Sequence, residues 1–220
     1  MNNLNVNFNG RSLHYNESEI DAVIEVLKSA PGLTQGNEQD KFQNSFNEYQ
    51  GAQHSFAFCN AASAIEIAAI LSGVGPGDEV IIPAHTYCAS AIPFGRTGAK
   101  IVWADIDHDT FVVTEETLKP LINSNTKAIV IVHLYGLCAN MPKILNLIEG
   151  KEIFLLEDCA QALGSICNGT KAGNFGDMSV FSFQSQKNIS TMGEGGMLCV
   201  KSSKLAEKVY GLRHNGHKPF

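Results

Sequence analysis

The chain has 220 residues, of which 44% are hydrophobic and 17% charged, and its formal net charge is −6. This composition predicts a globular protein with a sizeable core, and it excludes global disorder. The negative net charge argues against nucleic acid or an anionic membrane as the main partner. No apolar run approaches the roughly 20 residues that span a bilayer, and the first residues lack a signal-peptide pattern. We therefore expect a cytoplasmic protein.

The cysteines form no Cys-x-x-Cys pair. Most of them lie in apolar segments, which favours buried free thiols in a reducing compartment over disulfides or zinc ligation. We expect no metal site. The six are Cys59, Cys88, Cys138, Cys159, Cys167 and Cys199.

Two helices are predicted before the first strand. Asn16 with Glu19 three residues later is typical of a capping box, and apolar residues then recur at helical spacing through residue 27. Pro31-Gly32 ends this helix. A second helix is expected over Asn37–Tyr49.

Short apolar runs then alternate with amphipathic segments, which predicts strands joined by helices. Such strands, buried on both faces, indicate an α/β fold: a three-layer α/β/α sandwich with a mostly parallel seven-stranded sheet. The last two strands lack a long helix between them, so one can run antiparallel. The predicted strands are Ser55–Cys59, Glu79–Pro83, Lys100–Asp105, Ala128–His133, Ile153–Glu157, Met178–Phe183 and Gly196–Val200. The predicted helices are Ala62–Ser72, Ala89–Thr97, Thr114–Ile122, Lys143–Gly150 and Ser203–Leu212.

Ligands of such sheets bind beyond the carboxyl ends of the strands, so the polar residues there are the candidates. After the first strand, Ala61, Ala62 and Ser63 open a helix, whose unpaired backbone N–H groups favour a phosphate. A plain tight turn is the alternative. After the second strand, Tyr87 could stack on a flat ring and His85 could touch a ligand. The alternative for both, and for the histidine at position 133, is a packed or hydrogen-bonded side chain.

Three further candidates lie late in the chain. Asp158 follows a buried strand, where a carboxylate should be paired, and Gln161 could face the same ligand. Lys187 lies among small and polar residues before a glycine-rich turn. A lysine in a dry pocket is a strong nucleophile towards carbonyls, although most lysines simply lie at the surface.

These residues together suit pyridoxal phosphate. A lysine holds the aldehyde, and an aspartate keeps the pyridine nitrogen protonated so that the ring accepts electrons. An aromatic side chain stacks on the ring. Ser182 and the helix start would take the phosphate.

The chain resembles the DegT/DnrJ/StrS family of pyridoxal-phosphate-dependent sugar aminotransferases, which has the aspartate aminotransferase fold. The resemblance runs in order from about Leu13 to Gly216, and its pieces are specific only in combination. The matching stretches are GLTQG (Gly32–Gly36), GVGPGDEVIIPAHTY (Gly73–Tyr87), GAKIVWADID (Gly98–Asp107), VHLYG (Val132–Gly136), LEDCAQALGS (Leu156–Ser165), GDMSVFSF (Gly176–Phe183) and KNISTMGEGGM (Lys187–Met197).

The resemblance implies two catalytic residues. Lys187 would form the Schiff base and later move the proton, and Asp158 would pair with the pyridinium nitrogen. It also implies a stacking aromatic, a glutamine near the ring hydroxyl and phosphate-binding positions. The implied cofactor-binding residues are Ala62, Ser63, Tyr87, Asp158, Gln161, Ser182 and Lys187.

Two stretches depart from the family pattern. The first turn is often Gly-Thr-Ser/Ala, whereas here it is Ala61-Ala62-Ser63, so position 62 offers only its backbone N–H to a phosphate. The segment before the lysine is often His-x-x-Lys and is here Gln184-Ser-Gln-Lys187, which affects the substrate more than the reaction.

The resemblance implies a ping-pong reaction in which an amino acid, glutamate, gives its amino group to a keto sugar linked to a nucleotide. It implies a homodimer. We expect residues 1–36 to form an N-terminal helical segment and residues 37–220 the cofactor-binding large domain. We expect this sequence to lack the family's smaller C-terminal domain.

Three alternatives are weighed against this interpretation. The first is a sugar dehydratase on the same scaffold, in which a histidine replaces the Schiff-base lysine, so Lys187 argues against it. The second is a truncated paralogue that binds the cofactor but is inactive or depends on a partner. The third, a nucleotide-binding dehydrogenase, is disfavoured because no G-x-G-x-x-G follows the first strand.

Overall fold

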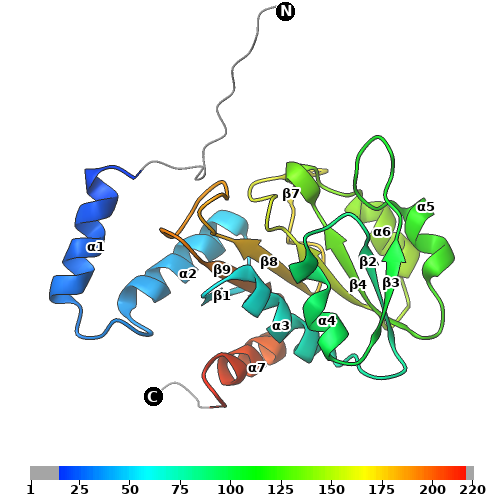
Figure 1. The fold of residues 1–220 in the computed structure, drawn as a ribbon, viewed down its shortest axis with the longest axis horizontal. Helices are drawn as coiled ribbons and strands as arrows, with labels where there is room; N and C mark the ends of the chain where they lie inside the picture. The colour runs from blue at the N-terminus through cyan, green and yellow to red at the C-terminus, as the bar shows by residue number, and fades with distance from the viewer. Residues whose placement is uncertain (1–14, 217–220) are drawn as a thin grey trace, which may run out of the picture.

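The computed structural model describes residues 15–216, and its central element is a seven-stranded sheet between two layers of helices (Figure 1). The order of the strands across the sheet is β1-β9-β8-β5-β4-β2-β3. The predicted fold class is confirmed. The strands of the sheet are β1 (His54–Phe58), β2 (Glu79–Pro83), β3 (Lys100–Ala104), β4 (Thr126–Val132), β5 (Phe154–Asp158), β8 (Met178–Ser182) and β9 (Gly196–Val200).

One strand of this sheet runs against the others. β9 is antiparallel to both of its neighbours, β1 and β8, whereas the remaining pairs are parallel. This confirms that one of the last two strands can reverse. A separate two-stranded sheet, which was not predicted, pairs β6 (Ile166–Cys167) with β7 (Thr170–Lys171).

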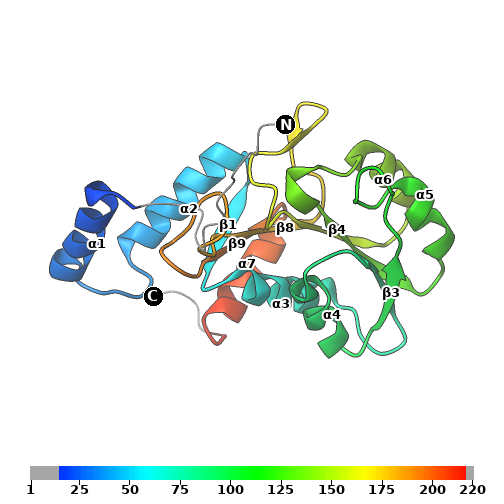
Figure 2. The ribbon, with the colours of Figure 1, turned by 45° about the horizontal axis from the view of Figure 1, so that its top comes forward.

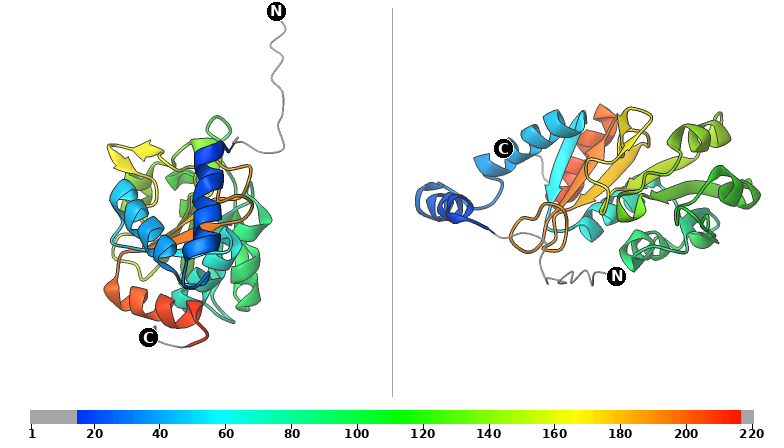
Figure 3. Two further views of the ribbon diagram at one scale, coloured as in Figure 1. Left: turned by 90° about the vertical axis from the view of Figure 1, so that its left-hand side faces the viewer. Right: turned by 90° about the horizontal axis from the view of Figure 1, so that it is seen from above.

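The helices cover both faces of the sheet (Figures 2 and 3). One layer contains α3 (Ala61–Ser72), α4 (Ile92–Arg96) and α7 (Ser203–Arg213). The other contains α2 (Asn37–Gln50), α5 (Glu115–Leu118) and α6 (Met141–Ile148). Short 3-10 turns are η1 (Cys88–Ser90), η2 (Lys119–Leu121) and η3 (Leu134–Gly136). In the described part of the chain, no helix has the length and apolar character that crossing a bilayer requires.

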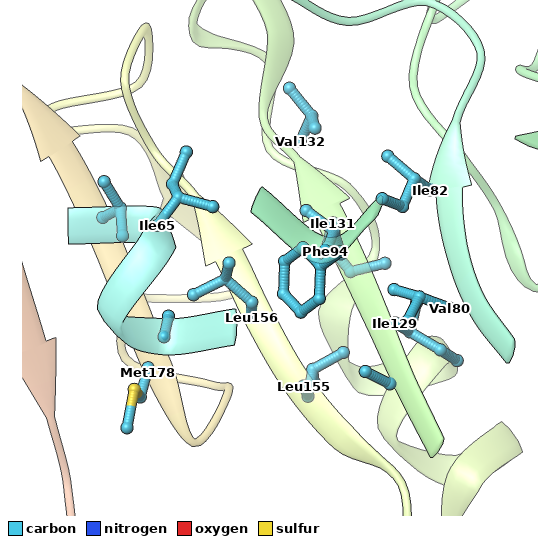
Figure 4. Close-up of a cluster of buried hydrophobic side chains, with 14 of the residues drawn as sticks. Ile65, Val80, Ile82, Phe94, Ile129, Ile131, Val132, Leu155, Leu156 and Met178 are labelled. Carbon is cyan, nitrogen blue, oxygen red and sulfur yellow. The ribbon is translucent and has the colours of Figure 1, made fainter. Parts of the chain in front are cut away.

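The core lies on both sides of the strands. Residues 128–132 of β4 and 155–158 of β5 are all buried, as expected for parallel strands covered on both faces. Beside β8, the aromatic rings of Phe46 and Phe181 meet edge to face at 5.1 Å. Figure 4 shows part of the larger cluster, including Ile65, Phe94, Ile129, Ile131 and Leu156.

The first helix, α1 (Glu17–Ser29), has the predicted capping box, because Asn16 and Glu19 each bond to the other's backbone. It lies at one end of the molecule in Figure 1 and contributes no buried residue. Its apolar stripe, residues 20, 23, 24 and 27, is therefore exposed within the described structure.

The cysteine prediction is only partly correct. All six are free, but burial holds only for Cys159 and Cys199, while Cys59 and Cys88 are exposed. Cys59 is the residue that follows β1, and Cys88 is the first residue of η1, in the segment that follows β2.

Gly196, the first residue of β9, allows α3 to start directly against the sheet. A Cβ at this position would lie 2.4 Å from the carbonyl carbon of Asn60 and 2.6 Å from the nitrogen of Ala61. Real contacts are never so short, so only glycine permits this approach. The start of α3 is thereby fixed next to β9.

The carboxylate of Glu157, in β5, is completely buried. It accepts N–H bonds from Gly173 at 2.8 Å and from Phe175 and Gly176 at 2.7 Å. It also pairs with Nε2 of His133 at 2.9 Å, while Nδ1 of that ring accepts the N–H of Ala139. In this arrangement Nδ1 is the acceptor and Nε2 is the donor to Glu157. The predicted alternative of a hydrogen-bonded role for His133 is confirmed.

These contacts set the protonation of Glu157. Burial raises the pKa of the carboxyl, but the hydrogen bond to His133 and the backbone N–H groups outweigh it and hold the pKa below 4.5. The group is therefore ionised at neutral pH, and His133 and the loop at residues 173–176 are tied to β5.

Replacing Gly196 with alanine is expected to lower the free energy of unfolding by about 1–3 kcal/mol, because the added methyl overlaps backbone atoms that cannot move freely. Gly211→Ala is the matched control, since its Cβ meets no atom within 4 Å and the site is helical. That variant should be neutral or stabilised by up to about 1 kcal/mol. Urea denaturation measures both, and equal midpoints for the two variants would contradict the close approach.

Glu157→Gln should cost roughly 1–3 kcal/mol of stability at neutral pH, because an amide NH₂ would face N–H donors. The sign of the pH dependence follows from the lowered pKa. The ionised carboxylate of Glu157 stabilises the fold at pH values above its unfolded-state pKa of about 4.5. This stabilisation is lost as the pH falls through the lower pKa of the folded state. The stability difference between wild type and Glu157→Gln should therefore shrink below that pH, as measured by denaturation at several pH values. The control is Glu152→Gln, at an exposed position. A difference that stays constant with pH would refute the ionised state.

Candidate functional site

A cavity of about 480 Å³ opens where the carboxyl ends of β4, β5 and β8 meet the start of α3. This is the edge of the sheet at which ligands of open α/β folds bind. Six of the seven residues predicted for the cofactor line this cavity: Ala62, Tyr87, Asp158, Gln161, Ser182 and Lys187. The structure thus brings together side chains that lie up to 125 positions apart in the chain.

Asp158 is the last residue of β5 and is 6% exposed. Its Oδ2 accepts the hydroxyl proton of Ser90 at 2.7 Å, and its Oδ1 accepts the N–H of Ala160 at 3.0 Å. The two bonds fix the carboxylate in the wall of the cavity. Because Glu157 precedes it in the strand, the two neighbouring carboxylates point to opposite faces of the sheet.

The start of α3 presents backbone N–H groups to the cavity. Asn60 is the N-cap, and its side chain accepts the N–H of Ser63 at 2.8 Å. The first-turn N–H groups of Ala61 and Ala62 have no acceptor within the helix, and both residues line the cavity. These groups and the helix dipole favour an anion there.

Ser63 is the one predicted residue that the structure does not bring to this cavity. It lines a neighbouring hollow with Arg213, and its hydroxyl lies 3.5 Å from the sulfur of Cys59. Its backbone N–H is already used by Asn60. A phosphate contact at this turn is therefore left to the two alanines before it.

Lys187 is delivered by the segment between β8 and β9. Its N–H donates to the carbonyl of Gln184 at 2.8 Å, which closes a tight turn, and the N–H of Ser185 donates to Gly193 at 2.8 Å. The lysine is half-buried and lines the cavity. Ser182, at the end of β8, lines the same wall.

Tyr87 and Gln161 also line the cavity. Tyr87 precedes η1 and is 73% exposed, so its ring is available to stack on a ligand. Gln161 uses Oε1 to accept the N–H of Tyr135 at 3.1 Å, which ties the loop after β4 to the loop after β5.

Several cavity residues were missed by sequence reasoning. Ser90 holds Asp158 and bonds to Thr86 at 2.8 Å, and Glu194 adds a carboxylate to the wall. No motif marks Ser90, because its partner lies 68 positions away. The cap at Asn60 was detectable, since asparagine before a run of small helix-forming residues is an N-cap signal.

A second group of chemical interest consists of residues that do not line the cavity. His133, Glu157 and Cys159 place possible ligand atoms within 4.8 Å of one another, all of them buried. Both nitrogens of the histidine and both carboxylate oxygens are already hydrogen-bonded. Burial also raises the pKa of the Cys159 thiol well above its usual value, which disfavours the thiolate that a metal needs.

Known proteins resemble this chain over most of its length. The model of the DegT/DnrJ/EryC1/StrS aminotransferase family matches residues 14–219. GDP-perosamine synthase of Caulobacter vibrioides is 39% identical over 202 residues, covering 92% of this chain and 54% of that protein. UDP-N-acetyl-3-dehydro-alpha-D-glucosamine 3-aminotransferase of Acidithiobacillus ferrooxidans is 37% identical, covering 82% and 49%.

A solved structure shows the same fold. GDP-4-keto-6-deoxymannose-3-dehydratase with a trapped PLP-glutamate geminal diamine superposes with a TM-score of 0.89 at 28% identity, covering 96% of this chain and 55% of that one. The chain spans about half the length of the curated relatives that it matches. Because the family model and the relatives match nearly all of it, the chain belongs to the DegT/DnrJ/EryC1/StrS aminotransferase family.

Proposed function

We propose that this chain forms the cofactor-binding part of a pyridoxal-phosphate-dependent aminotransferase that places an amino group on a nucleotide-linked keto sugar. The observation that carries the proposal is that Lys187 and Asp158 line one cavity together with the start of α3. Relatives named GDP-perosamine synthase and UDP-N-acetyl-3-dehydro-alpha-D-glucosamine 3-aminotransferase support the substrate class. Glutamate as the amino donor is part of the proposal.

The cavity has the donor set that this cofactor needs. The phosphate of the cofactor would meet the unpaired N–H groups of Ala61 and Ala62, and the ring nitrogen of the cofactor would meet the carboxylate of Asp158. Lys187 lines the same space. When bound, pyridoxal phosphate supplies an aldehyde that takes up the amino group and a ring that accepts electrons.

The chain's own residues would perform the proton chemistry. Asp158, held by Ser90 and Ala160, would hold the ring nitrogen of the bound cofactor in its protonated form. The amine of Lys187 would serve as a nucleophile towards the aldehyde and as a base that moves a proton. Tyr87 would cover one face of the ring, and Gln161 would lie beside its hydroxyl.

Amino transfer is favoured over dehydration by the residue at position 187. The dehydratase among the structural neighbours shares the fold, so the fold does not distinguish the two reactions. Lysine can both attach to the aldehyde and return the proton, which amino transfer requires. A cytoplasmic location, a homodimer and a large domain over residues 37–220 are further parts of the proposal.

The first test is the visible absorption spectrum of the chain with added pyridoxal phosphate, before and after glutamate. A Schiff-base band that glutamate bleaches supports a working first half of the reaction. A stable band that glutamate leaves unchanged supports a cofactor-binding chain that needs a partner. The absence of a band would refute the proposed role of the cavity.

Lys187→Ala should remove the band and abolish amino transfer, because no other amine would occupy its place in the cavity. The melting temperature should change little, since the lysine is only half-buried. Lys204→Ala, at an exposed position on α7, is the control and should keep both band and activity. Normal turnover by Lys187→Ala would show that the assigned role is wrong.

Asp158→Asn keeps the shape of the side chain but removes the charge that holds the ring proton. The band should remain, while amino transfer should slow by about 10²–10⁴-fold, the usual size of an acid–base effect. Ser90→Ala removes a single bond to this carboxylate and should slow the reaction less. Single-turnover absorbance measurements after glutamate addition compare the three proteins, and full activity of Asp158→Asn would overturn the electron-withdrawal role.

A further inference from the structure

Three rings form an aromatic rim beside the cavity: His85, Phe111 and Tyr135. The imidazole of His85 meets the ring of Phe111 edge to face at 6.3 Å and that of Tyr135 at 6.0 Å. The three residues follow β2, β3 and β4, so they come from three neighbouring strands at the edge of the sheet where the cavity opens. Thr86 and Leu134, the chain neighbours of two of them, line the cavity itself. The rim therefore continues the cavity wall outwards.

The backbone holds two of these rings in unusual conformations. Phe111 has φ of 59° and Tyr135 has φ of 53°, a region that bulky residues rarely adopt. Both rings are nevertheless exposed, by 50% and 71%. The strained backbone costs free energy, and the exposed rings do not offset this cost by becoming buried. Backbone strain of this kind clusters at ligand-binding sites.

The loops that impose this strain are strongly bonded. The N–H of Phe111 donates to the carbonyl of Asp107, whose side chain also accepts the N–H groups of Asp109 and Thr110. The N–H of Tyr135 donates to Gln161, which lines the cavity. The rim is thus built before any ligand arrives.

His85 contributes an unsatisfied polar atom. Its Nδ1 is buried and has no hydrogen-bond partner among the described residues. A buried polar atom without a partner costs free energy, so a ligand hydroxyl entering between the rings would recover a hydrogen bond.

The chemistry of the rim indicates what it would take. Aromatic faces pack on the apolar C–H face of a sugar, while His85 and nearby carboxylates can bond to hydroxyl groups. The segment that carries Phe111 contains three aspartates (positions 105, 107 and 109) and no lysine or arginine between residues 105 and 113. That charge disfavours a diphosphate and suits an uncharged ring.

We propose that the rim of His85, Phe111 and Tyr135 binds the pyranose ring of the substrate and selects for it. The proposal rests on the proposed function, since it assigns the sugar of the nucleotide-linked substrate to this place beside the cofactor. The nucleotide itself would lie elsewhere. Phe111 and Tyr135 are specificity-determining residues in this proposal, and neither takes part in proton transfer.

The test measures binding rather than turnover. The 220-residue chain with pyridoxal phosphate is titrated with GDP-mannose and UDP-N-acetylglucosamine, and with GDP and UDP as sugar-free controls. Saturation-transfer NMR reports which ligand protons touch the protein. For at least one probe, the pyranose protons should receive saturation in the wild-type chain.

The variant is the double substitution Phe111→Asn and Tyr135→Asn. Asparagine tolerates positive φ, so the loops keep their shape while both rings are removed. The dissociation constant of the nucleotide sugar should rise by about tenfold, as expected for the loss of ring contacts, while that of the free nucleotide stays constant. Trp103→Thr removes a ring of similar exposure (53%) on β3 and should change neither constant.

Three outcomes would overturn the proposal. The first is equal sugar affinity in wild type and double variant. The second is a wild-type chain that binds the cofactor but transfers no saturation to either pyranose. The third is a double variant that changes its oligomeric mass by ultracentrifugation with unchanged sugar binding, which would make the rim a subunit contact. The cofactor band, recorded on the same samples, fails only if the proposed function itself is wrong.

Discussion

The buried carboxylate of Glu157 is the constraint on which the site depends. It lies at the end of β5, and it collects hydrogen bonds from His133 after β4 and from the loop at residues 173–176 before β8. Three neighbouring strands are thereby held in register at the edge where the cavity opens. A buried charge is costly unless each lone pair is used, and here every bond comes from a group whose position matters for the site.

Asp158 shows how this constraint reaches the chemistry. It is the next residue of the strand, so any displacement of Glu157 would move it directly. Its side chain is held by Ser90 and Ala160, and its backbone pairs with β4 and β8. The contacts of Glu157 hold the carboxyl end of β5, and Asp158 lies beside it in the wall of the cavity. A preorganised carboxylate requires such an arrangement.

The strand pattern was predictable because it depends on burial, which repeats along the chain. β2 and β9 have the predicted bounds, and β1, β3, β4, β5 and β8 differ by one or two residues. Helices were placed less well where proline intervenes. The predicted helix at Ala89–Thr97 is split into η1 and α4, and the one at Thr114–Ile122 into α5 and η2, because Pro93 and Pro120 cannot donate the backbone bonds that an uninterrupted helix needs.

The rest of the site could not be predicted, because it depends on pairs that are distant in sequence. Ser90 meets Asp158 and Tyr135 meets Gln161 only after folding. Two local signals were available and unused. Asn60 caps α3 and removes Ser63 from the cavity, and Asn168-Gly169, with φ of 48° and 82°, is the usual turn of a tight hairpin such as β6–β7.

The antiparallel strand β9 also decides when the molecule can be completed. β1 pairs with no strand of the described sheet except β9, so His54 has no strand partner until Val200 has been synthesised. During synthesis the chain emerges from its amino end, and β1 and α2 must remain without that support until almost the whole described chain has been made. The insertion of β9 then joins the early and late parts of the sheet and closes the segment that carries Lys187. Lys187 thus reaches the cavity in the same step that completes the described sheet. A nascent chain in which β9 has not yet paired therefore has no formed site at which an aldehyde could react with this lysine.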